Sequence, residues 1–498
     1  MTQRLQHSLT LAQRHHAVGE LSEAKGIYRK ILRDAPNHPI ALHLMGVIAY
    51  QNRENDVALD FIKKALIIKP DYAEAHNNLG VIFKELKEID EAITCYKRAL
   101  TINNDYAEAH YNLGVVLKEI GKLDEAITSY KRALEHKPDY AEALYNLGNA
   151  LNECGELEEA IASYRETITI KPDYAEAHSN LGNVLKKIGK PNEAEFSYRK
   201  ALAIRPDYAE AHSNLGAVLR ELGRLNDAEE SYKKALSIKP DFAETHSNLG
   251  HVLHALGKFN EAADSLRKAV GIEPDLPGVQ HRLNALLGIT TDFAPRQYVE
   301  DIFNSYAKKF DNHLVNVLKY DAPIMLKKAL LDLGLAQRKY KNVIDLGCGT
   351  GLSGLEFRDI AETLIGIDLS EEMVRKAEQK NIYDRLYVDD IVGRLEILKT
   401  QFSLFISSDV FAYIGDLLPL FSCIKRHSTQ NSLLVFSTEH TDDGDFILRN
   451  TARYAHSKDY ILSIAKQQGF RLEFFTTCNL RYERDGWIIG GLFVLKVT

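Results

Sequence analysis

The sequence predicts a chain of two parts, an all-α solenoid of helical hairpins followed by an α/β domain with a mostly parallel sheet. A motif of 34 residues repeats without slips through the first half of the chain. From about Thr291 this period is lost, and short apolar runs alternate with helical stretches. A glycine-rich turn follows one of these runs at Val343. We therefore place a repeat array at residues 1–290, a helical lid or connector at 291–340 and the α/β domain at 341–498.

The repeat is marked by columns of small or helix-ending residues at intervals of 34. Within one unit, "YAEAHNNLGVIFKELKEIDEAITCYKRALTI", apolar residues recur at three- and four-residue spacing on both sides of a polar break, which predicts two amphipathic helices. Eight units follow from the period, with a final capping helix near "GVQHRLNALLG". The column that ends the second helices is Pro36, Pro70, Asn104, Pro138, Pro172, Pro206, Pro240 and Pro274.

This pattern resembles the tetratricopeptide repeat, which implies a superhelix with an extended concave groove. The units also resemble those of O-linked N-acetylglucosamine transferase, in which asparagines at one motif position grip the backbone of a peptide. An amide side chain both donates and accepts, so such a series predicts a groove for a protein or peptide partner. Alternatively, the asparagine is a solvated neighbour of the buried Leu-Gly pair, repeated by duplication. The series is Asn78, Asn112, Asn146, Asn180, Asn214 and Asn248, and Leu44 interrupts it in the second unit.

Seven strands are predicted in the second half of the chain, with helices between the first six. The last two are separated only by "ERDG", which is too short for a crossover helix, so they must pair antiparallel. The predicted strands are "KNVIDLG", "TLIGIDL", "RLYV", "FSLFISS", "LLVFST", "RLEFFTTCNLRY" and "WIIGGLFVLKV".

The glycine-rich turn can be counted in two registers. From Gly349 it spells GxGxxG, the dinucleotide fingerprint, and from Asp345 it spells DxGxGxG, the nucleotide-binding turn of methyltransferases that use S-adenosylmethionine. The antiparallel last strand resembles the Rossmann-like class I methyltransferase fold, and residues 295–498 resemble a group of bacterial tetratricopeptide-linked methyltransferases. A carboxylate at Asp345 suits a cationic amino group and would repel a pyrophosphate. We expect S-adenosylmethionine, with a nicotinamide cofactor as the alternative.

The resemblance implies a set of cofactor contacts. Asp368 lies 23 residues after Asp345, where a carboxylate accepts the ribose hydroxyls, and Ser370 is the better N-cap for the next helix. An acidic residue after the third strand meets the adenine amino group, and Asp390 is favoured over Asp389. The expected cofactor set is Asp345, Gly347, Cys348, Gly349, Gly351, Asp368, Leu369, Asp390, Ile391, Ser408 and Tyr306.

Catalytic candidates follow the fourth and fifth strands. "FSLFISSDVFAYIGDL" resembles the fourth methyltransferase motif, although Ser403 replaces the usual Asp. Tyr306, with Phe310 and Asp311, resembles a "YAxxFD" lid over the cofactor. The long polar stretch after the fifth strand predicts the acceptor site, where a base is needed only if the nucleophile carries a proton. The candidates are Asp409, His440, His456 and Tyr454, each with a structural role as its alternative.

Composition excludes several classes of protein. A net charge of -7, with no basic stripe of interleaved aromatics, argues against a nucleic-acid substrate. The five cysteines are scattered singly, which predicts reduced thiols and no metal site. No window reaches the roughly 20 apolar residues of a membrane span, and no signal peptide is visible, so we expect a cytoplasmic protein.

The leading hypothesis is an S-adenosylmethionine-dependent methyltransferase whose repeats recruit a protein or peptide. One alternative keeps methyl transfer but makes the acceptor a small metabolite or glycan, with the repeats as a scaffold. The other is a non-catalytic adaptor that binds S-adenosylmethionine as a structural or sensing ligand.

Overall fold

The computed structural model describes residues 3–483 and 486–498 and contains two compact units, Met1–Ile238 and Lys239–Thr498. The second unit therefore holds helices of the last repeat together with the α/β domain. The domain boundaries expected near residues 290 and 340 stay predictions. In the part of the chain that the structure describes, no helix is both long and apolar enough to cross a membrane.

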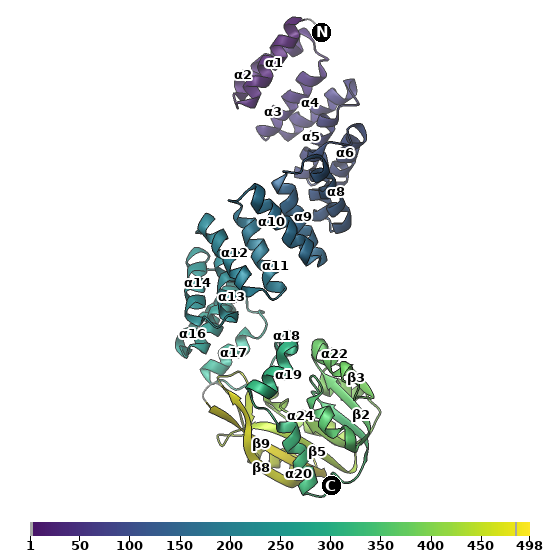
Figure 1. Cartoon of the computed structure of the whole chain (residues 1–498), viewed down its shortest axis with the longest axis vertical. Helices are drawn as coiled ribbons and strands as arrows, with labels where there is room; N and C mark the ends of the chain where they lie inside the picture. Colours follow the sequence, from purple (N-terminus) through teal and green to yellow (C-terminus); the bar gives the residue numbers. More distant parts are fainter. Residues whose placement is uncertain (1–2, 484–485) are drawn as a thin grey trace. The chain divides into compact units, whose positions relative to one another are not determined.

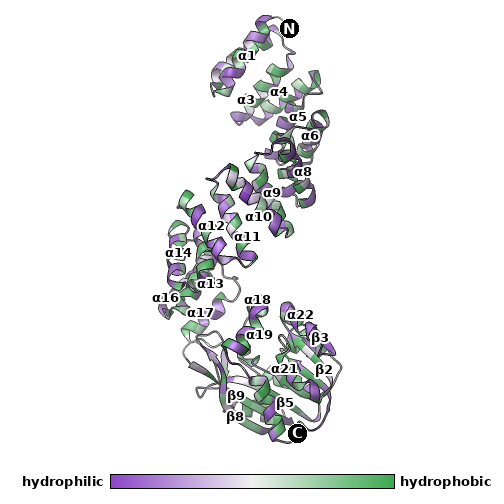
Figure 2. Cartoon of the chain, in the orientation of Figure 1, coloured by the Kyte–Doolittle hydropathy of each residue, from purple (hydrophilic) through white to green (hydrophobic). Residues whose placement is uncertain are grey.

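The first unit consists of helices that follow one another as hairpins, which confirms the predicted all-α fold (Figure 1). Each helix carries hydrophobic and hydrophilic residues along its length, as expected when one side packs on its neighbours (Figure 2). The helices are α1 (Gln3–Ala17), α2 (Leu21–Asp34), α3 (Pro39–Gln51), α4 (Asn55–Ile68), α5 (Ala73–Glu85), α6 (Ile89–Ile102), α7 (Ala107–Glu119), α8 (Leu123–His136), α9 (Ala141–Cys154), α10 (Leu157–Ile170), α11 (Ala175–Lys187), α12 (Pro191–Ile204), α13 (Ala209–Glu221) and α14 (Leu225–Ile238).

A glycine and a tyrosine set the distance between the two helices of a hairpin. Gly148 on α9 lies under the ring of Tyr164 on α10, and Tyr164 is fully buried. A Cβ atom at Gly148 would lie 2.7 Å from Cε1 of Tyr164, closer than two carbons can approach. The glycine column is therefore a packing requirement. The same contact recurs at Gly80 and Tyr96, Gly114 and Tyr130, Gly182 and Tyr198, and Gly216 and Tyr232.

We expect Gly148→Ala to lower the free energy of unfolding by about 1–3 kcal/mol, because the added methyl group must displace the ring of Tyr164. Urea denaturation of the full chain measures this change. Gly26→Ala in α2 is the matched control, since a Cβ there meets nothing within 4 Å. Helix propensity alone predicts a gain of up to about 1 kcal/mol at Gly26. Equal losses in the two variants would contradict the packing explanation.

The second unit begins with helices and continues into the sheet domain. Its first three helices are α15 (Ala243–Ala255), α16 (Phe259–Ile272) and α17 (Val279–Leu287). The segment before the first strand holds α18 (Arg296–Tyr306), the short α19 (Phe310–Asn312), a π-helical turn at His313–Val317 and α20 (Ala322–Asp332).

The sheet has the predicted topology, with two short strands added. Its main order is β3-β2-β1-β4-β5-β9-β8, and β9 runs antiparallel to both β5 and β8. Two short strands in the long polar stretch, β6 and β7, continue the sheet from the end of β5. The strands are β1 (Tyr340–Leu346), β2 (Ala361–Asp368), β3 (Arg385–Val388), β4 (Phe402–Ser407), β5 (Ser428–His440), β6 (Phe446–Leu448), β7 (Tyr454–His456), β8 (Phe470–Glu483) and β9 (Gly486–Val497). The turn expected at 483–486 includes Arg484 and Asp485, which lie outside the described residues.

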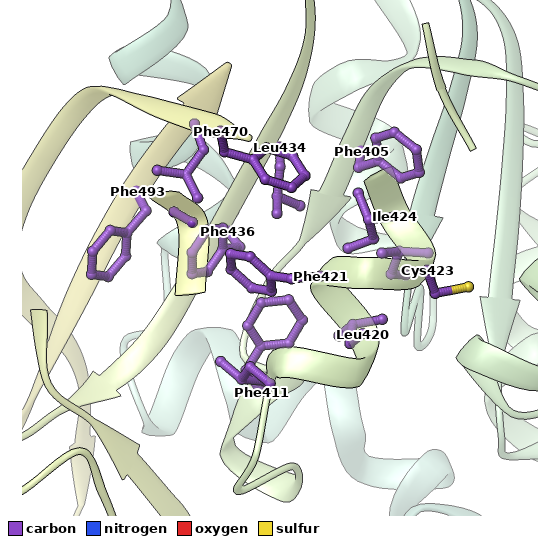
Figure 3. Packing of buried hydrophobic residues seen from close by; sticks show 14 of the residues in the cluster. Phe405, Phe411, Leu420, Phe421, Cys423, Ile424, Leu434, Phe436, Phe470 and Phe493 are labelled. Carbon is purple, nitrogen blue, oxygen red and sulfur yellow. The ribbon is translucent and has the colours of Figure 1, made fainter. Parts of the chain in front are cut away.

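Helices between the strands cover the sheet with an aromatic-rich core. Phe421 on α24 packs edge-on against Phe436 of β5, and the ring of Phe436 stacks on Phe493 of β9 with centroids 5.0 Å apart (Figure 3). This core fixes the strands whose ends form the site described below. The helices are α21 (Leu352–Phe357), α22 (Glu371–Gln379), α23 (Ile391–Ile397), α24 (Leu418–Arg426) and α25 (Lys458–Gln467).

Candidate active site

The turn after β1 is shaped by three glycines with left-handed backbone angles. Their φ values are 74° for Gly347, 52° for Gly349 and 91° for Gly351, a region that L side chains rarely adopt. At Gly347 a Cβ atom would also lie 2.3 Å from the side chain of Val410. The amides of residues 347 and 348 donate to the carbonyl oxygen of Ile367 in β2. The turn is thereby held against the neighbouring strand.

A cavity of about 1180 Å³ lies at the carboxyl ends of the strands, where open α/β sheets bind ligands. Most of the predicted cofactor residues line it, together with one predicted catalytic residue. The predicted residues on its wall are Tyr306, Gly347, Cys348, Gly349, Asp368, Leu369, Asp390, Ile391, Ser408 and Asp409.

Asp368 ends β2 and presents a half-buried carboxylate to this cavity. Its Oδ2 accepts the amide of Gly349 at 2.8 Å, and its Oδ1 accepts the amide of Ser370 at 2.9 Å. Burial raises the pKa of Asp368, and these backbone hydrogen bonds oppose the rise. Each carboxylate oxygen keeps capacity for a further donor, as binding of a diol requires. Ser370 caps α22 through its own hydroxyl, as predicted.

Asp345 lies behind the glycine turn and does not line the cavity. Tyr383 donates to its Oδ2 at 2.6 Å, while its fully buried Oδ1 has no partner among the described residues. Burial raises the pKa of Asp345 to about 7, and Tyr383 opposes the rise. An unpaired buried carboxylate oxygen is costly when it is ionised, in line with the raised pKa. Gly351 also lies off the cavity wall, beside the ring of Tyr383.

Two adjacent aspartates stand at the end of β3. Asp390 caps α23 by accepting the amide of Gly393 at 2.8 Å, and it lines the cavity as well. Asp389 also lines the cavity and pairs with Arg394 at 2.8 Å. The capping role is therefore present, and the choice between the two residues as ligand contact stays a prediction.

A network of buried ion pairs forms another wall of the cavity. Arg481 on β8 has only 2% of its side chain exposed and pairs with Asp409 at 2.5 Å, with Glu483 at 2.6 Å and with Glu439. Arg453 pairs with Glu439 at 2.7 Å and with Glu483 at 2.6 Å. Burial alone would raise the pKa of Glu483, but the two arginines hold it below its ordinary value. The network therefore keeps opposite charges paired where water is scarce.

Asp409 itself is held in an uncommon conformation. Its φ is 59°, in the left-handed region, and its amide donates to the hydroxyl of Ser437 at 2.9 Å. Burial raises the pKa of Asp409, and Arg481 opposes the rise. A non-glycine residue adopts this backbone conformation where the surrounding structure holds it in place. Here it turns the carboxylate toward Arg481 at the cavity wall.

Family models match both parts of the chain, the repeats and the α/β domain. A family model described as the cilia and flagella-associated protein 70 C-terminal domain matches residues 2–214 and again 74–284. A methyltransferase domain model matches residues 343–431, which contain the glycine turn, Asp368 and Asp409. The chain belongs to the tetratricopeptide-repeat proteins fused to a methyltransferase domain.

Individual relatives match only parts of this chain. An uncharacterized protein of Haemophilus influenzae is 36% identical over 24% of this chain and 49% of its own length. A malonyl-[acyl-carrier protein] O-methyltransferase of Hamiltonella defensa is 30% identical over 19% of this chain and 37% of its own length. The chain thus spans half or less of the length of these relatives. The solved structure of YrrB, titled a TPR protein with an unusual peptide-binding site, is 24% identical over 36% of this chain and 93% of its own, with a TM-score of 0.33.

Three of the four predicted catalytic residues do not line the cavity. His456 is fully buried, its Nε2 donates to two carbonyl oxygens at 2.9 Å, and burial lowers its pKa to about 4. The hydroxyl of Tyr454 contacts that of Thr291 at 2.6 Å, and Nε2 of His440 faces Asp442 at 3.3 Å. These placements match the structural alternatives for all three residues.

The predicted lid makes specific contacts with the glycine turn and with α22. Asn304 on α18 accepts the hydroxyl of Ser370 at 2.7 Å. Asp311 accepts the hydroxyl of Thr350 within the glycine turn and pairs with Lys380 at 2.9 Å. Tyr306, Phe310 and the following π-helical turn supply aromatic and apolar lining to the cavity. The lid is therefore bonded to the glycine turn and to both ends of α22.

The predicted asparagine series of the repeats is half-buried throughout. In the structural unit Met1–Ile238, each side-chain amide of the series donates to a residue of the preceding repeat. For example, Asn112 donates to Asn77 at 3.0 Å, and Asn146 donates to the hydroxyl of Tyr111 at 3.1 Å. Asn180 donates to both Tyr145 at 3.1 Å and Asn149 at 2.9 Å. Asn78 donates to His43 and Asn214 to Asn183, while Asn248 lies on α15 of the second unit. The series thus links successive repeats, a role that the sequence analysis did not assign to it.

Sequence reasoning missed several residues on the cavity wall, above all Arg481, Glu483 and His313. A β-bulge between residues 479 and 481 breaks the alternation of β8, so that Leu480 and Arg481 are both buried. Simple alternation gives no sign of this. His313 belongs to the same stretch as the predicted Phe310 and Asp311, and that proximity was the available signal.

The titration of Asp345 should be visible in protein stability. Its pKa in the folded state, about 7, lies above the ordinary value of 3.8. Between these values the folded chain holds a proton that the unfolded chain has lost, so the free energy of unfolding falls as pH rises through this window. Asp345→Asn cannot ionise and should lose less stability between pH 5 and pH 8, measured by urea denaturation without ligand. The exposed Asp332→Asn should follow the wild type, and parallel curves for all three proteins would contradict the assignment.

Proposed function

We propose that this chain transfers a methyl group from S-adenosylmethionine to an acceptor, and that its repeats bind the protein or peptide that brings the acceptor to the site. The observation that carries the cofactor assignment is the contact between Asp368 and the amide of Gly349. It joins a carboxylate with spare acceptor capacity to a glycine turn that lets a ligand approach the backbone.

The residues present suit this cofactor chemically. Asp368 lines the cavity and would accept the ribose hydroxyls. Asp389 and Asp390 offer acceptors for the adenine amino group. When bound, S-adenosylmethionine supplies a methyl group on a positively charged sulfur. No cluster of His, Cys, Asp and Glu suited to a metal ion occurs among the described residues.

The size and lining of the cavity support a second ligand beside the cofactor. Its volume of about 1180 Å³ exceeds the 300–1,000 Å³ that a single drug-sized ligand usually occupies. Aromatic and apolar side chains such as Phe293, Phe303 and Leu318 form much of the remaining wall. This apolar space favours, as the second candidate function, methyl transfer to a small metabolite, with the repeats as a scaffold.

The repeats support partner binding through their amide groups. The side-chain oxygen of Asn149 accepts Tyr164 at 2.8 Å and Asn180 at 2.9 Å, which leaves its NH₂ group for another acceptor. Asn183 repeats this arrangement with Tyr198 and Asn214 one repeat later. Two fixed amide donors in successive repeats suit the carbonyl groups of an extended peptide backbone. We therefore infer that the surface formed by Asn149 and Asn183, the amide face, binds peptides with little sequence specificity.

The test incubates the full chain with methyl-labelled S-adenosylmethionine and a lysate of its host, then separates macromolecules from small molecules. Label on a discrete protein supports the leading proposal, and label only on small molecules supports the second. Tight binding of S-adenosylmethionine without any transfer would overturn both and favour an adaptor.

Variants then test the role of the repeats. Asn149→Ala with Asn183→Ala should lower protein labelling at least about tenfold, on the scale of two lost hydrogen bonds. The control changes Arg165 and Arg199, which lie on second helices with more than half of each side chain exposed, to alanine. Equal labelling by the two double variants would contradict recruitment through the amide face. Circular dichroism confirms that each variant is folded.

A further inference from the structure

Two lid residues form a pair at the cavity wall that the cofactor assignment does not explain. Tyr306 ends α18 and His313 begins the π-helical turn, and both line the cavity. The hydroxyl of Tyr306 is in hydrogen-bond contact with Nδ1 of His313, and the two rings meet edge to face with centroids 5.5 Å apart. The ring of Phe310 also meets that of Tyr306 edge to face, with centroids 5.3 Å apart. A phenol and an imidazole are thus held together beside the reaction space.

Three carboxylates on the cavity wall are poorly suited to accept a proton from an acceptor. Asp409 and Glu483 are both paired with the buried guanidinium of Arg481. Asp368 already accepts two backbone amides at the cofactor end. Protonation of a carboxylate would break such charge-assisted bonds, which are about twice as strong as neutral ones.

Histidine is the most frequent general base in enzymes. His313 is the one imidazole on the cavity wall among the residues that the structure describes. Burial, with a contribution from the charge of Glu483, raises the pKa of Tyr306 to about 12. Tyr306 therefore keeps its proton at neutral pH, so it can relay a proton but is a poor base by itself.

We propose that His313 accepts the proton of the methyl acceptor through the hydroxyl of Tyr306, and that the acceptor is therefore a hydroxyl or an amine. This inference rests on the proposed methyl transfer. The acceptor heteroatom forms a bond to the methyl carbon as the bond between that carbon and sulfur breaks, and the electron pair of the broken bond passes to sulfur. The heteroatom proton passes to the oxygen of Tyr306, while the proton of Tyr306 passes to Nδ1 of His313. One positive charge leaves sulfur and one appears on the imidazole.

The test compares label transfer in single turnovers by the full chain, using methyl-labelled S-adenosylmethionine and the host lysate fraction that the wild type labels. His313→Asn keeps a partner for Tyr306 but takes no proton, and Tyr306→Phe removes the relay. Each should slow transfer about 100-fold. The double variant should be no slower than the worse single variant, because the two residues act on one proton. Lys309→Gln, an exposed change on the same lid, should keep the wild-type rate.

Two further readouts do not depend on turnover. Calorimetry should show that His313→Asn binds S-adenosylhomocysteine as the wild type does. Nitrogen NMR of histidine-labelled protein identifies the His313 resonances as those that are absent from the His313→Asn spectrum. The Nδ1 resonance of His313 should have the chemical shift of a nitrogen that accepts a hydrogen bond. This chemical shift should change in Tyr306→Phe.

Three results would overturn the relay while methyl transfer stands. These are a wild-type rate in either single variant, additive losses in the double variant, or a loss of S-adenosylhomocysteine binding that accounts for the slower transfer by His313→Asn. A wild-type chain that labels nothing would overturn the proposed function itself, and the relay with it.

Discussion

Replacing Arg481 by alanine is expected to lower the free energy of unfolding by about 3–5 kcal/mol, the range found when one partner of a buried ion pair is removed. The guanidinium is buried and contacts the carboxylates of Asp409, Glu439 and Glu483. Without it, Arg449 and Arg453 remain beside Glu439, only Arg453 of the two remains beside Glu483, and Asp409 loses its paired charge. Urea denaturation at pH 7 measures the loss.

Arg471→Ala supplies a control on the same strand. Arg471 pairs with Glu473 at 2.7 Å, but 66% of its side chain is exposed. Exposed pairs of this kind contribute about 0–1 kcal/mol, so this variant should stay close to the wild type. A loss of less than about 1 kcal/mol in Arg481→Ala would mean that water enters the network and screens its charges. Such a result would also remove the basis for treating Asp409 and Glu483 as unable to accept a proton.

Asp368→Asn is expected to weaken binding of S-adenosylhomocysteine about 100-fold. Hydrogen bonds to a charged group contribute about 1.5–3 kcal/mol each, and two ribose hydroxyls would lose part of that strength. A loss of about 3 kcal/mol corresponds to roughly a hundredfold change in Kd. The asparagine oxygen can still accept the amide of Gly349, so the glycine turn should keep its shape. Calorimetry measures the affinity.

The matched control is Glu362→Gln, which removes a carboxylate at the exposed start of the same strand. It should bind S-adenosylhomocysteine with wild-type affinity. An Asp368→Asn protein that binds within about threefold of the wild type would refute the ribose contact. Thermal unfolding of the unliganded variant separates this result from a general loss of structure.

The fold could be predicted largely because its signals are local and repeated. The glycine column recurs every 34 residues, and the structure shows its cause in contacts such as Gly148 with Tyr164. The antiparallel pairing of β8 with β9 could be predicted because the segment between them is too short for a crossover helix. The short strands β6 and β7 were not predicted, because three-residue strands within a polar stretch carry too little hydrophobic pattern.

The candidate site was harder to predict, because its parts come from distant segments. The glycine turn and Asp368 belong to one continuous motif, and the structure brings them into contact. Arg481 reaches the cavity only through the bulge in β8, which no alternation pattern reveals. His440 and His456 are polar residues near the expected acceptor region, yet their side chains bond elsewhere. Residue type and sequence position alone do not show which way a side chain points.

The contact between α17 and the turn before β7 bears on how such chains evolve. Nε2 of His281 donates to the carbonyl oxygen of Ala452, the residue before Arg453 of the cavity wall. Ala285 of α17 shares a buried cluster with Tyr298, Ala452 and Tyr454. A recombination event that cut the gene after this helix would expose that cluster and release the backbone next to Arg453. We therefore expect lineages to gain and lose repeats ahead of Lys239, while the last helices are inherited together with the domain they support.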